Sequence, residues 1–274
     1  GGVPSKTLNI ALAGTGVGKS LFMCHLASSY LLQGLNVLYI TLEMAEERIA
    51  ERIDANLLDV TMEDLHDMPQ QLYEGKISKL REKTQGQLVI KEYPTASAHS
   101  GHFKSLMNEL ALKKSFRPDV IFIDYLNICA SSRFKGGNIS SYFYVKAIAE
   151  ELRGLAVEFN VPIFSATQTT RTGYVSTDIG LEDTSESFGL PATADFMFAL
   201  ISNEELEALG QMKVKQLKNR YNDPSINRAF IIGVDRAKMR LYDVQQKAGE
   251  IVDANQVDEK EDAYNKFSDF KIWV

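Results

Sequence analysis

A short glycine-rich segment near the start of the chain has the residue types and the spacing of a phosphate-binding turn. It joins an apolar, strand-like run to a run of helical character. In such a turn, successive backbone N–H groups surround an anion, and the helix N-terminus adds unpaired donors and partial positive charge. A lysine at its end reaches the terminal phosphates, and the next serine is a natural Mg²⁺ ligand. The segment predicts binding of ATP or another nucleoside triphosphate by Gly14, Thr15, Gly16, Val17, Gly18, Lys19 and Ser20.

The segment departs from the usual pattern at its first position, where Ala13 stands in place of glycine. A methyl group is tolerated there if the backbone angle φ of Ala13 is negative. The alternative is a flexible glycine-rich turn without a ligand. The strand-turn-helix context of Gly18, Lys19 and Ser20 favours the nucleotide site instead.

Asp124 ends an apolar run, Val120 to Ile123, of the kind that forms a strand buried on both faces of a parallel sheet. The carboxyl ends of such strands form the edge at which open α/β sheets bind ligands. We therefore expect Asp124 to hold Mg²⁺ through water, together with the Ser20 hydroxyl.

Glu43 and Gln168 also follow strand-like runs, over 36–41 and 161–166. Glu43 could polarise the water that attacks the γ-phosphate, and the neutral Gln168 amide could read that phosphate without competing for the metal. Two alternatives stay open on the residues alone. Glu43 could cap the next helix, because acids favour helix starts, and Gln168 could be an ordinary loop amide.

Two polar loops carry basic residues. The loop Ser131–Ser141 holds Arg133 and Lys135, and the loop Thr169–Asp183 holds Arg171. Both are rich in Gly, Ser or Thr and follow the predicted phosphate-sensing residues at the ligand-binding edge. We expect them to contact the backbone phosphates of DNA, so that binding depends on salt and little on sequence.

A basic turn, 218–224, holds Lys218 and Arg220 far along the chain from the phosphate loop. An arginine in this place could complete the site of a neighbouring subunit, which would make hydrolysis depend on assembly. A head-to-tail interface that closes forms a ring. The alternative, a solvated surface turn, stays open for the two residues considered by themselves.

The bulk composition excludes several classes of protein. A net charge of −6 argues against a protein that coats nucleic acid with its whole surface, although a local basic channel stays compatible with it. The sequence has no run of eighteen apolar residues, so we expect no membrane contact. Two cysteines, in no metal-ligand spacing, favour a reduced, cytoplasmic protein.

The length of 274 residues and the 45% hydrophobic content suit one large α/β domain, which we place at residues 1–245. Its sheet should be mostly parallel and flanked by helices. Antiparallel strands at 229–234 and 239–244 should form its C-terminal edge. Residues 246–274 are polar and acidic and are interpreted as a tail that docks against a partner.

The order of the motifs resembles the RecA-like core, and within it the hexameric replicative DNA helicases of the DnaB type, above all those of T-even-type phages. The motifs that carry this resemblance are Thr41-Leu42-Glu43-Met44, Ile123-Asp124-Tyr125-Leu126, Ala166-Thr167-Gln168, Ser185-Glu186-Ser187 with Ala194-Asp195, and Lys218-Asn219-Arg220. Together they are specific, although each motif alone is not. The resemblance covers roughly residues 1 to 245.

The resemblance implies a role for each matching residue. Lys19, Ser20 and Asp124 would bind phosphate and metal, Glu43 would be the catalytic base and Gln168 the γ-phosphate sensor. Arg220, with Lys218 beside it, would reach into a neighbour's site. Glu186 and Ser187 would join the DNA contacts. Ser185 departs from bacterial relatives, which place an arginine there, so Arg133 or Arg171 is expected to take over that contact.

The resemblance also implies an ATP- and Mg²⁺-dependent DNA helicase motor that acts as a homo-hexamer around single-stranded DNA. A primase and a helicase loader would be its partners, and a phage protein would work in the host cytoplasm. Family members carry an N-terminal domain, which we expect to lie outside this chain. Two other functions share the phosphate loop: a RecA-like strand-exchange recombinase, which forms filaments, and a small-molecule kinase, which needs an acceptor pocket and a lid.

Overall fold

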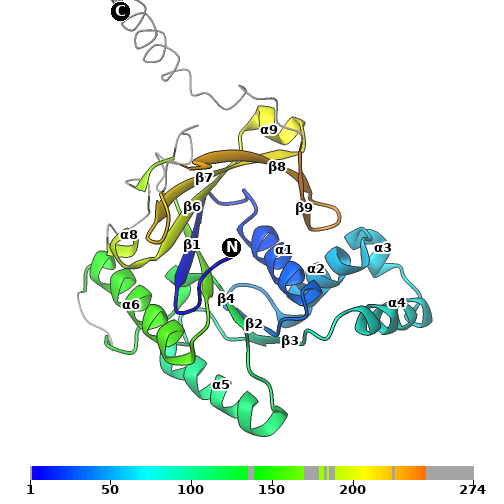
Figure 1. Cartoon of the computed structure of the whole chain (residues 1–274), viewed down its shortest axis with the longest axis horizontal. Helices are drawn as coiled ribbons and strands as arrows, with labels where there is room; N and C mark the ends of the chain where they lie inside the picture. Colours follow the sequence, from blue (N-terminus) through cyan, green and yellow to red (C-terminus); the bar gives the residue numbers. More distant parts are fainter. Residues whose placement is uncertain are drawn as a thin grey trace, which may run out of the picture.

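A nine-stranded sheet runs through the computed structural model, which describes residues 2–134, 139–169, 179–181, 184, 189–223 and 226–244. The strand order is β3-β2-β4-β5-β1-β6-β7-β8-β9. The strands are β1 (Leu8–Ala13), β2 (Val37–Thr41), β3 (Leu88–Glu92), β4 (Val120–Asp124), β5 (Ile163–Gln168), β6 (Phe196–Ile201), β7 (Gln211–Asn219), β8 (Ala229–Asp235) and β9 (Arg240–Asp243). Figure 1 shows the sheet passing between two groups of helices.

The sheet changes direction at β6. Strands β3, β2, β4, β5, β1 and β6 pair in parallel, whereas β7, β8 and β9 continue the sheet in antiparallel pairing. The predicted mostly parallel sheet with an antiparallel C-terminal edge is confirmed. Because the parallel strands share one direction, the loops that follow β1, β2, β4 and β5 meet at one edge.

Helices cover both faces of the sheet. On one side lie α1 (Lys19–Leu32) and α2 (Glu46–Leu58), and on the other α5 (Ser100–Lys114) and α6 (Ser141–Phe159). The shorter elements are α3 (Met62–His66), α4 (Gln70–Lys83), a 3₁₀ turn (Leu126–Ile128), α8 (Gly189–Thr193) and α9 (Glu204–Ala208). No helix in the described part of the chain is long and apolar enough to cross a membrane.

The buried strands divide their side chains between two cores. In β4, Val120 and Phe122 pack with α1 and α2, while Ile121 and Ile123 pack with α5 and α6. This two-sided burial explains why the central strands are almost wholly apolar. The residue that ends β4, Asp124, is therefore the exception that needs explaining.

The predicted basic turn begins later than expected. Lys218 and Asn219 belong to β7, and the turn starts after them. The Lys218 ammonium donates hydrogen bonds to the carbonyl oxygens of Pro191 (2.6 Å) and Ala192 (3.3 Å) of α8. These partners are distant in the sequence, so the pattern of residues could not reveal them.

Candidate nucleotide-binding site

The phosphate loop joins the end of β1 to the start of α1. Gly16 (φ 80°) and Gly18 (φ 123°) have positive φ values that side chains disfavour, so both turns of the loop require glycine. The first turn of α1 contains no acidic residue, which leaves its N-terminus suited to an anion. The predicted strand-turn-helix context is confirmed.

Ala13 does not disturb the loop. It is the last residue of β1, is fully buried and lies between Gln168 of β5 and Leu200 of β6 in the sheet register. Extended backbone accepts any side chain that fits. The glycine of the usual pattern is therefore unnecessary at this position.

The Lys19 side chain is folded onto the loop that precedes it. Its ammonium donates to the carbonyl oxygen of Gly14 at 3.2 Å and lies 5.9 Å from the centroid of the Tyr125 ring. Burial lowers the pKa of Lys19, while the charges of Glu43 and Asp124 oppose that shift. The three charged residues predicted from separate motifs thus share one electrostatic environment.

Asp124 is fully buried at the end of β4. The Tyr39 hydroxyl donates to its Oδ2 atom at 3.0 Å. Burial raises the pKa of Asp124, and Ser20, Tyr39 and Lys19 each oppose the rise. Its Oδ1 atom is buried without a hydrogen-bond partner among the described residues. A buried carboxylate oxygen without a partner is costly, and a hydrated Mg²⁺ ion would satisfy it.

The residues present therefore fit a magnesium ion. Ser20, on the first turn of α1, faces the same carboxyl group and supplies a second oxygen. Mg²⁺ prefers oxygen ligands, keeps several waters and is commonly held by one or two protein groups plus phosphate. Among the described residues there is no cluster of three or more His, Cys, Asp or Glu side chains for a metal held by protein alone.

Glu43 does not cap α2. The N-cap of that helix is Ala45, without a side-chain cap, and the first helical N–H, of Glu46, donates to Glu92 at 3.2 Å. Glu43 is exposed in the segment between β2 and α2, close enough to act on the charge of Lys19. An exposed carboxylate at this edge can accept a proton from water.

Gln168 ends β5 and is paired with Ala13 in the sheet register, next to the phosphate loop. Its side-chain amide donates to the Tyr125 hydroxyl at 3.2 Å. The amide therefore has a defined position beside Lys19 rather than that of an ordinary loop residue. Its role as a phosphate sensor stays a prediction.

Arg220 lies at the opposite edge of the sheet from the phosphate loop. Its N–H donates to the carbonyl oxygen of Asp195, whose own N–H donates to Leu8, the first residue of β1. The phosphate loop follows the last residue, Ala13, about 16 Å away at roughly 3.3 Å per residue. Arg220 therefore cannot serve the phosphate loop of its own chain.

The Arg220 guanidinium is bound to a buried carboxylate. Its Nε lies 3.1 Å from Asp195 Oδ1, and Arg153 of α6 binds both oxygens of the same carboxyl group at 3.0–3.3 Å. Asp195 is fully buried and also accepts the N–H of Leu8 at 3.0 Å. The sequence motifs gave no sign of this arrangement.

Of the residues predicted for DNA contact, only Arg133 lies within the described part of the chain. It forms an ion pair with Glu150 of α6, and half of its side chain is exposed. Glu151 holds the start of the loop by accepting hydrogen bonds from Ser131 Oγ (2.6 Å) and the N–H of Ser132 (3.0 Å). Lys135, Arg171, Glu186 and Ser187 lie outside the described residues.

Four residues near the phosphate loop were not predicted. Tyr39 and Tyr125 contact Asp124 and Gln168 through their hydroxyls. Arg236, in the turn between β8 and β9, donates to the carbonyl oxygen of Val17 at 3.4 Å. Arg52 of α2 acts electrostatically on Asp124. Only a buried tyrosine in an otherwise apolar strand was a usable signal.

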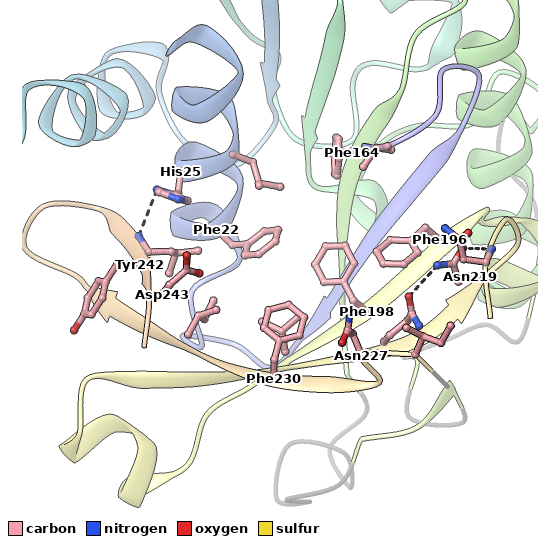
Figure 2. Close-up of a pocket in the computed structure, with 18 of the residues that line it drawn as sticks. Phe22, His25, Phe164, Phe196, Phe198, Asn219, Asn227, Phe230, Tyr242 and Asp243 are labelled. Atoms are coloured by element: carbon pink, nitrogen blue, oxygen red, sulfur yellow. Dashed lines mark hydrogen bonds between the residues drawn. The ribbon is translucent and has the colours of Figure 1, made fainter. Parts of the chain in front are cut away.

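A separate cavity of about 680 Å³ lies between α1 and the antiparallel strands. Figure 2 shows Phe22 of α1 pointing toward Phe198 of β6 and Phe230 of β8, and the rings of Phe22 and Phe198 are 5.1 Å apart. None of the described predicted site residues lines this cavity. It is an apolar space apart from the candidate phosphate chemistry.

An ATPase domain of the RecA type is the class that this sheet order and this ligand-binding edge define. The structure is similar to a solved structure whose title describes an ATPase domain (TM-score 0.72, 17% identity, 89% of this chain and 87% of that chain). It is also similar to "The Structure Of A DnaB-Like Replicative Helicase And Its Interactions With Primase" (TM-score 0.70, 16% identity, 88% and 58%).

Residues 1–248 match the model of the DnaB-like helicase C terminal domain, and the chain belongs to that family. It is 45% identical over 274 residues to the "DnaB-like replicative helicase" of Enterobacteria phage T4, covering 97% of this chain and 58% of that protein. It is 33% identical over 168 residues to a "Probable plasmid replicative DNA helicase" of Chlamydia trachomatis, covering 59% and 35%. The chain thus spans about a third to three fifths of these relatives.

Proposed function

We propose that this chain is the motor domain of an ATP-dependent replicative DNA helicase that works as a hexameric ring on single-stranded DNA. Family membership supports the class, and nucleotide binding follows from it. The observation that carries the proposal further is the separation of Lys19 and Arg220 to opposite edges of one sheet. A site split in this way is complete only when two subunits meet.

Each residue at the ligand-binding edge has a proposed task. The loop N–H groups and Lys19 bind the β- and γ-phosphates, and Lys19 must leave Gly14 to do so. Ser20 and Asp124 would hold Mg²⁺, which neutralises charge on the transferred phosphoryl group when bound. Glu43 accepts a proton from the attacking water, and Gln168 contacts the γ-phosphate.

The opposite edge supplies the second half of a neighbour's site. Arg220 would leave Asp195 and stabilise charge on the neighbour's γ-phosphate, with Lys218 beside it. A head-to-tail contact of this kind, repeated around a closed ring, gives every site one arginine.

The DNA track is proposed to consist of Arg133, Lys135 and Arg171, with Glu186 and Ser187 nearby. Basic loops that line a ring give an acidic protein a positive channel. Residues 246–274 are proposed to dock against a partner, with a primase and a helicase loader as the expected ones. Such a motor acts where DNA is replicated, in the cytoplasm of a host cell.

The test combines three measurements on the chain: oligomer mass, ATPase rate with and without single-stranded DNA, and unwinding of a forked duplex. We expect ring-sized oligomers, stimulation by single-stranded DNA and unwinding, with Lys19→Ala as the inactive control. Helical filaments with strand exchange would indicate a recombinase. Stimulation by a metabolite instead of DNA would indicate a small-molecule kinase.

A further inference from the structure

A single tyrosine interrupts the apolar side chains that β2 presents to the core between the sheet and α1. Tyr39 is fully buried, and its hydroxyl donates to Asp124 Oδ2 at 3.0 Å. A buried hydroxyl costs free energy unless it is hydrogen-bonded, so a phenylalanine would serve better here if packing were the only requirement. The hydroxyl therefore has a task at Asp124.

The Tyr39 ring is held in place by its neighbours. It stacks on Phe122 of β4 at 5.8 Å between centroids and 15° between planes, and Phe122 stacks in turn on Phe164 of β5 at 5.3 Å. Three aromatic rings from three adjacent strands thus form one stack. The hydroxyl at its end has little freedom to leave the carboxylate.

A second donor sets the direction of the hydrogen bond. Cys24 Sγ lies 3.9 Å from the Tyr39 hydroxyl. The phenol has one proton, which it gives to Asp124, so its oxygen accepts from the thiol. Cys24 stands four residues after Ser20, on the same side of α1. One face of α1 thus addresses Asp124 twice, through Ser20 and through Cys24 and Tyr39.

The two oxygens of Asp124 are consequently unlike. Tyr39 occupies Oδ2, while Oδ1 is buried and without a partner among the described residues. We propose that Tyr39 is a positioning residue that fixes Oδ2, so that Oδ1 faces the hydration shell of the nucleotide-bound magnesium ion. This inference rests on the proposed metal role of Asp124.

The decisive variant is Tyr39→Phe, which removes one oxygen atom and keeps the ring stack. We expect Mn²⁺ affinity in the presence of ADP, measured by electron paramagnetic resonance, to fall about 10-fold, as is typical when a metal ligand loses its supporting hydrogen bond. Binding of a fluorescent ADP in EDTA should stay at the parental value. The magnesium concentration for half-maximal ATPase should rise, with the maximal rate largely recovered at saturation.

Tyr30→Phe is the matched control. Tyr30 of α1 packs edge-on against Phe122 and Phe164 in the same core, at 6.2 and 6.1 Å, but it makes no described contact with Asp124. This variant should bind Mn²⁺ like the parent. Parental Mn²⁺ affinity in Tyr39→Phe would overturn the proposal, as would an equal loss of ADP binding in EDTA.

Two cysteine variants keep the proposal testable if Tyr39→Phe does not fold. Cys24→Ala removes the donor to Tyr39 and should weaken Mn²⁺ binding by about two-fold, whereas Cys24→Ser supplies a hydroxyl donor and should restore it. Equal affinities in the two would contradict the proposal. Asp124→Asn separates the two levels: if it retains Mn²⁺ binding, the proposed metal site itself fails, whatever Tyr39 does.

Discussion

Two fully buried aspartates, at opposite ends of the sheet, have very different surroundings. Asp195 accepts hydrogen bonds from Arg153, Arg220 and the N–H of Leu8. Asp124 accepts one from Tyr39, and its Oδ1 has no partner within the described part of the chain. One carboxylate is saturated by its own protein, and the other is left incomplete.

The difference separates two uses of a buried charge. Asp195 compensates its burial with cations and raises the pKa of Arg153 through their hydrogen bond, so it contributes to the stability of the fold. Burial instead raises the pKa of Asp124, which marks a site that is unfavourable until a ligand arrives. Incomplete satisfaction is a stronger sign of function than burial alone.

The largest expected effect comes from removing the cation that must leave Asp195. If Arg220 acts on a neighbour's phosphate, Arg220→Ala lowers ATP turnover by about 10³–10⁵-fold. Nucleotide binding should persist, because Lys19, Ser20 and Asp124 are unchanged. Steady-state ATPase and fluorescent ADP binding measure the two. The control is Arg48→Ala, an exposed arginine paired with Glu51 on the surface.

Mixing subunits tests whether the two ends belong to one shared site. A Glu43→Gln subunit still supplies Arg220 to a neighbour whose Glu43 is intact. Arg220→Ala and Glu43→Gln subunits, each inactive, should regain ATPase when mixed in one ring. Absence of recovery at every ratio in rings proven to be mixed would place the arginine elsewhere.

A smaller loss is expected at the Asp124 end. Glu43→Gln should bind nucleotide normally and lose about 10²–10⁴-fold in turnover, since a positioned base contributes that much. Glu47→Gln, on the exposed first turn of α2, is the control. Near-parental turnover in Glu43→Gln would remove the base from Glu43.

The stability of the ligand-free protein should respond in opposite directions at the two aspartates. Asp195→Asn leaves two arginines without their carboxylate and should destabilise by about 1–3 kcal/mol, moderated because both arginines are partly exposed. Asp124→Asn removes an uncompensated buried charge and should raise Tm by about 2–4 °C. Thermal unfolding without nucleotide measures both.

The pH dependence follows from the direction of the Asp124 shift. The folded-state pKa lies above the ordinary value of 3.8, so the folded parent binds this proton more tightly than the unfolded chain. Its stability therefore rises as pH falls through the raised pKa, down to about 3.8. The advantage of Asp124→Asn should be greatest at neutral pH and should shrink over that acidic range.

The smallest effect is expected at the exposed pair of Arg133 and Glu150. Glu150→Gln should change stability by less than about 1 kcal/mol, yet strengthen single-stranded DNA binding by freeing Arg133. Arg133→Ala should weaken that binding and lower its salt slope by about 0.7. Titrations at several salt concentrations decide, and an unchanged slope would exclude Arg133 from the track.

The sequence predicted what depends on local patterns. Apolar runs marked β1, β2, β4 and β5, and the polar residue after each run marked the ligand-binding edge. Glycine spacing marked the phosphate loop because positive φ at Gly16 and Gly18 has a local cause. These features need no knowledge of distant contacts.

The rest depends on contacts between distant residues. Arg153, Asp195 and Arg220 lie in separate elements, and nothing in their spacing shows that they meet. The end of β7 was misplaced because Lys218 is held by carbonyls of α8. Tyr39 was passed over because an aromatic residue suits a buried strand, and only the position of its hydroxyl distinguishes it from phenylalanine.

Strand β1 ties the two ends together. Its first residue donates to Asp195 and its last leads into the phosphate loop, with full burial between them. It acts as a strut of fixed length, since a paired central strand cannot stretch. When one end of the strut is pushed, the other must follow. A ring of such subunits would transmit motion as a train of stiff levers, with all compliance confined to the joints between neighbours.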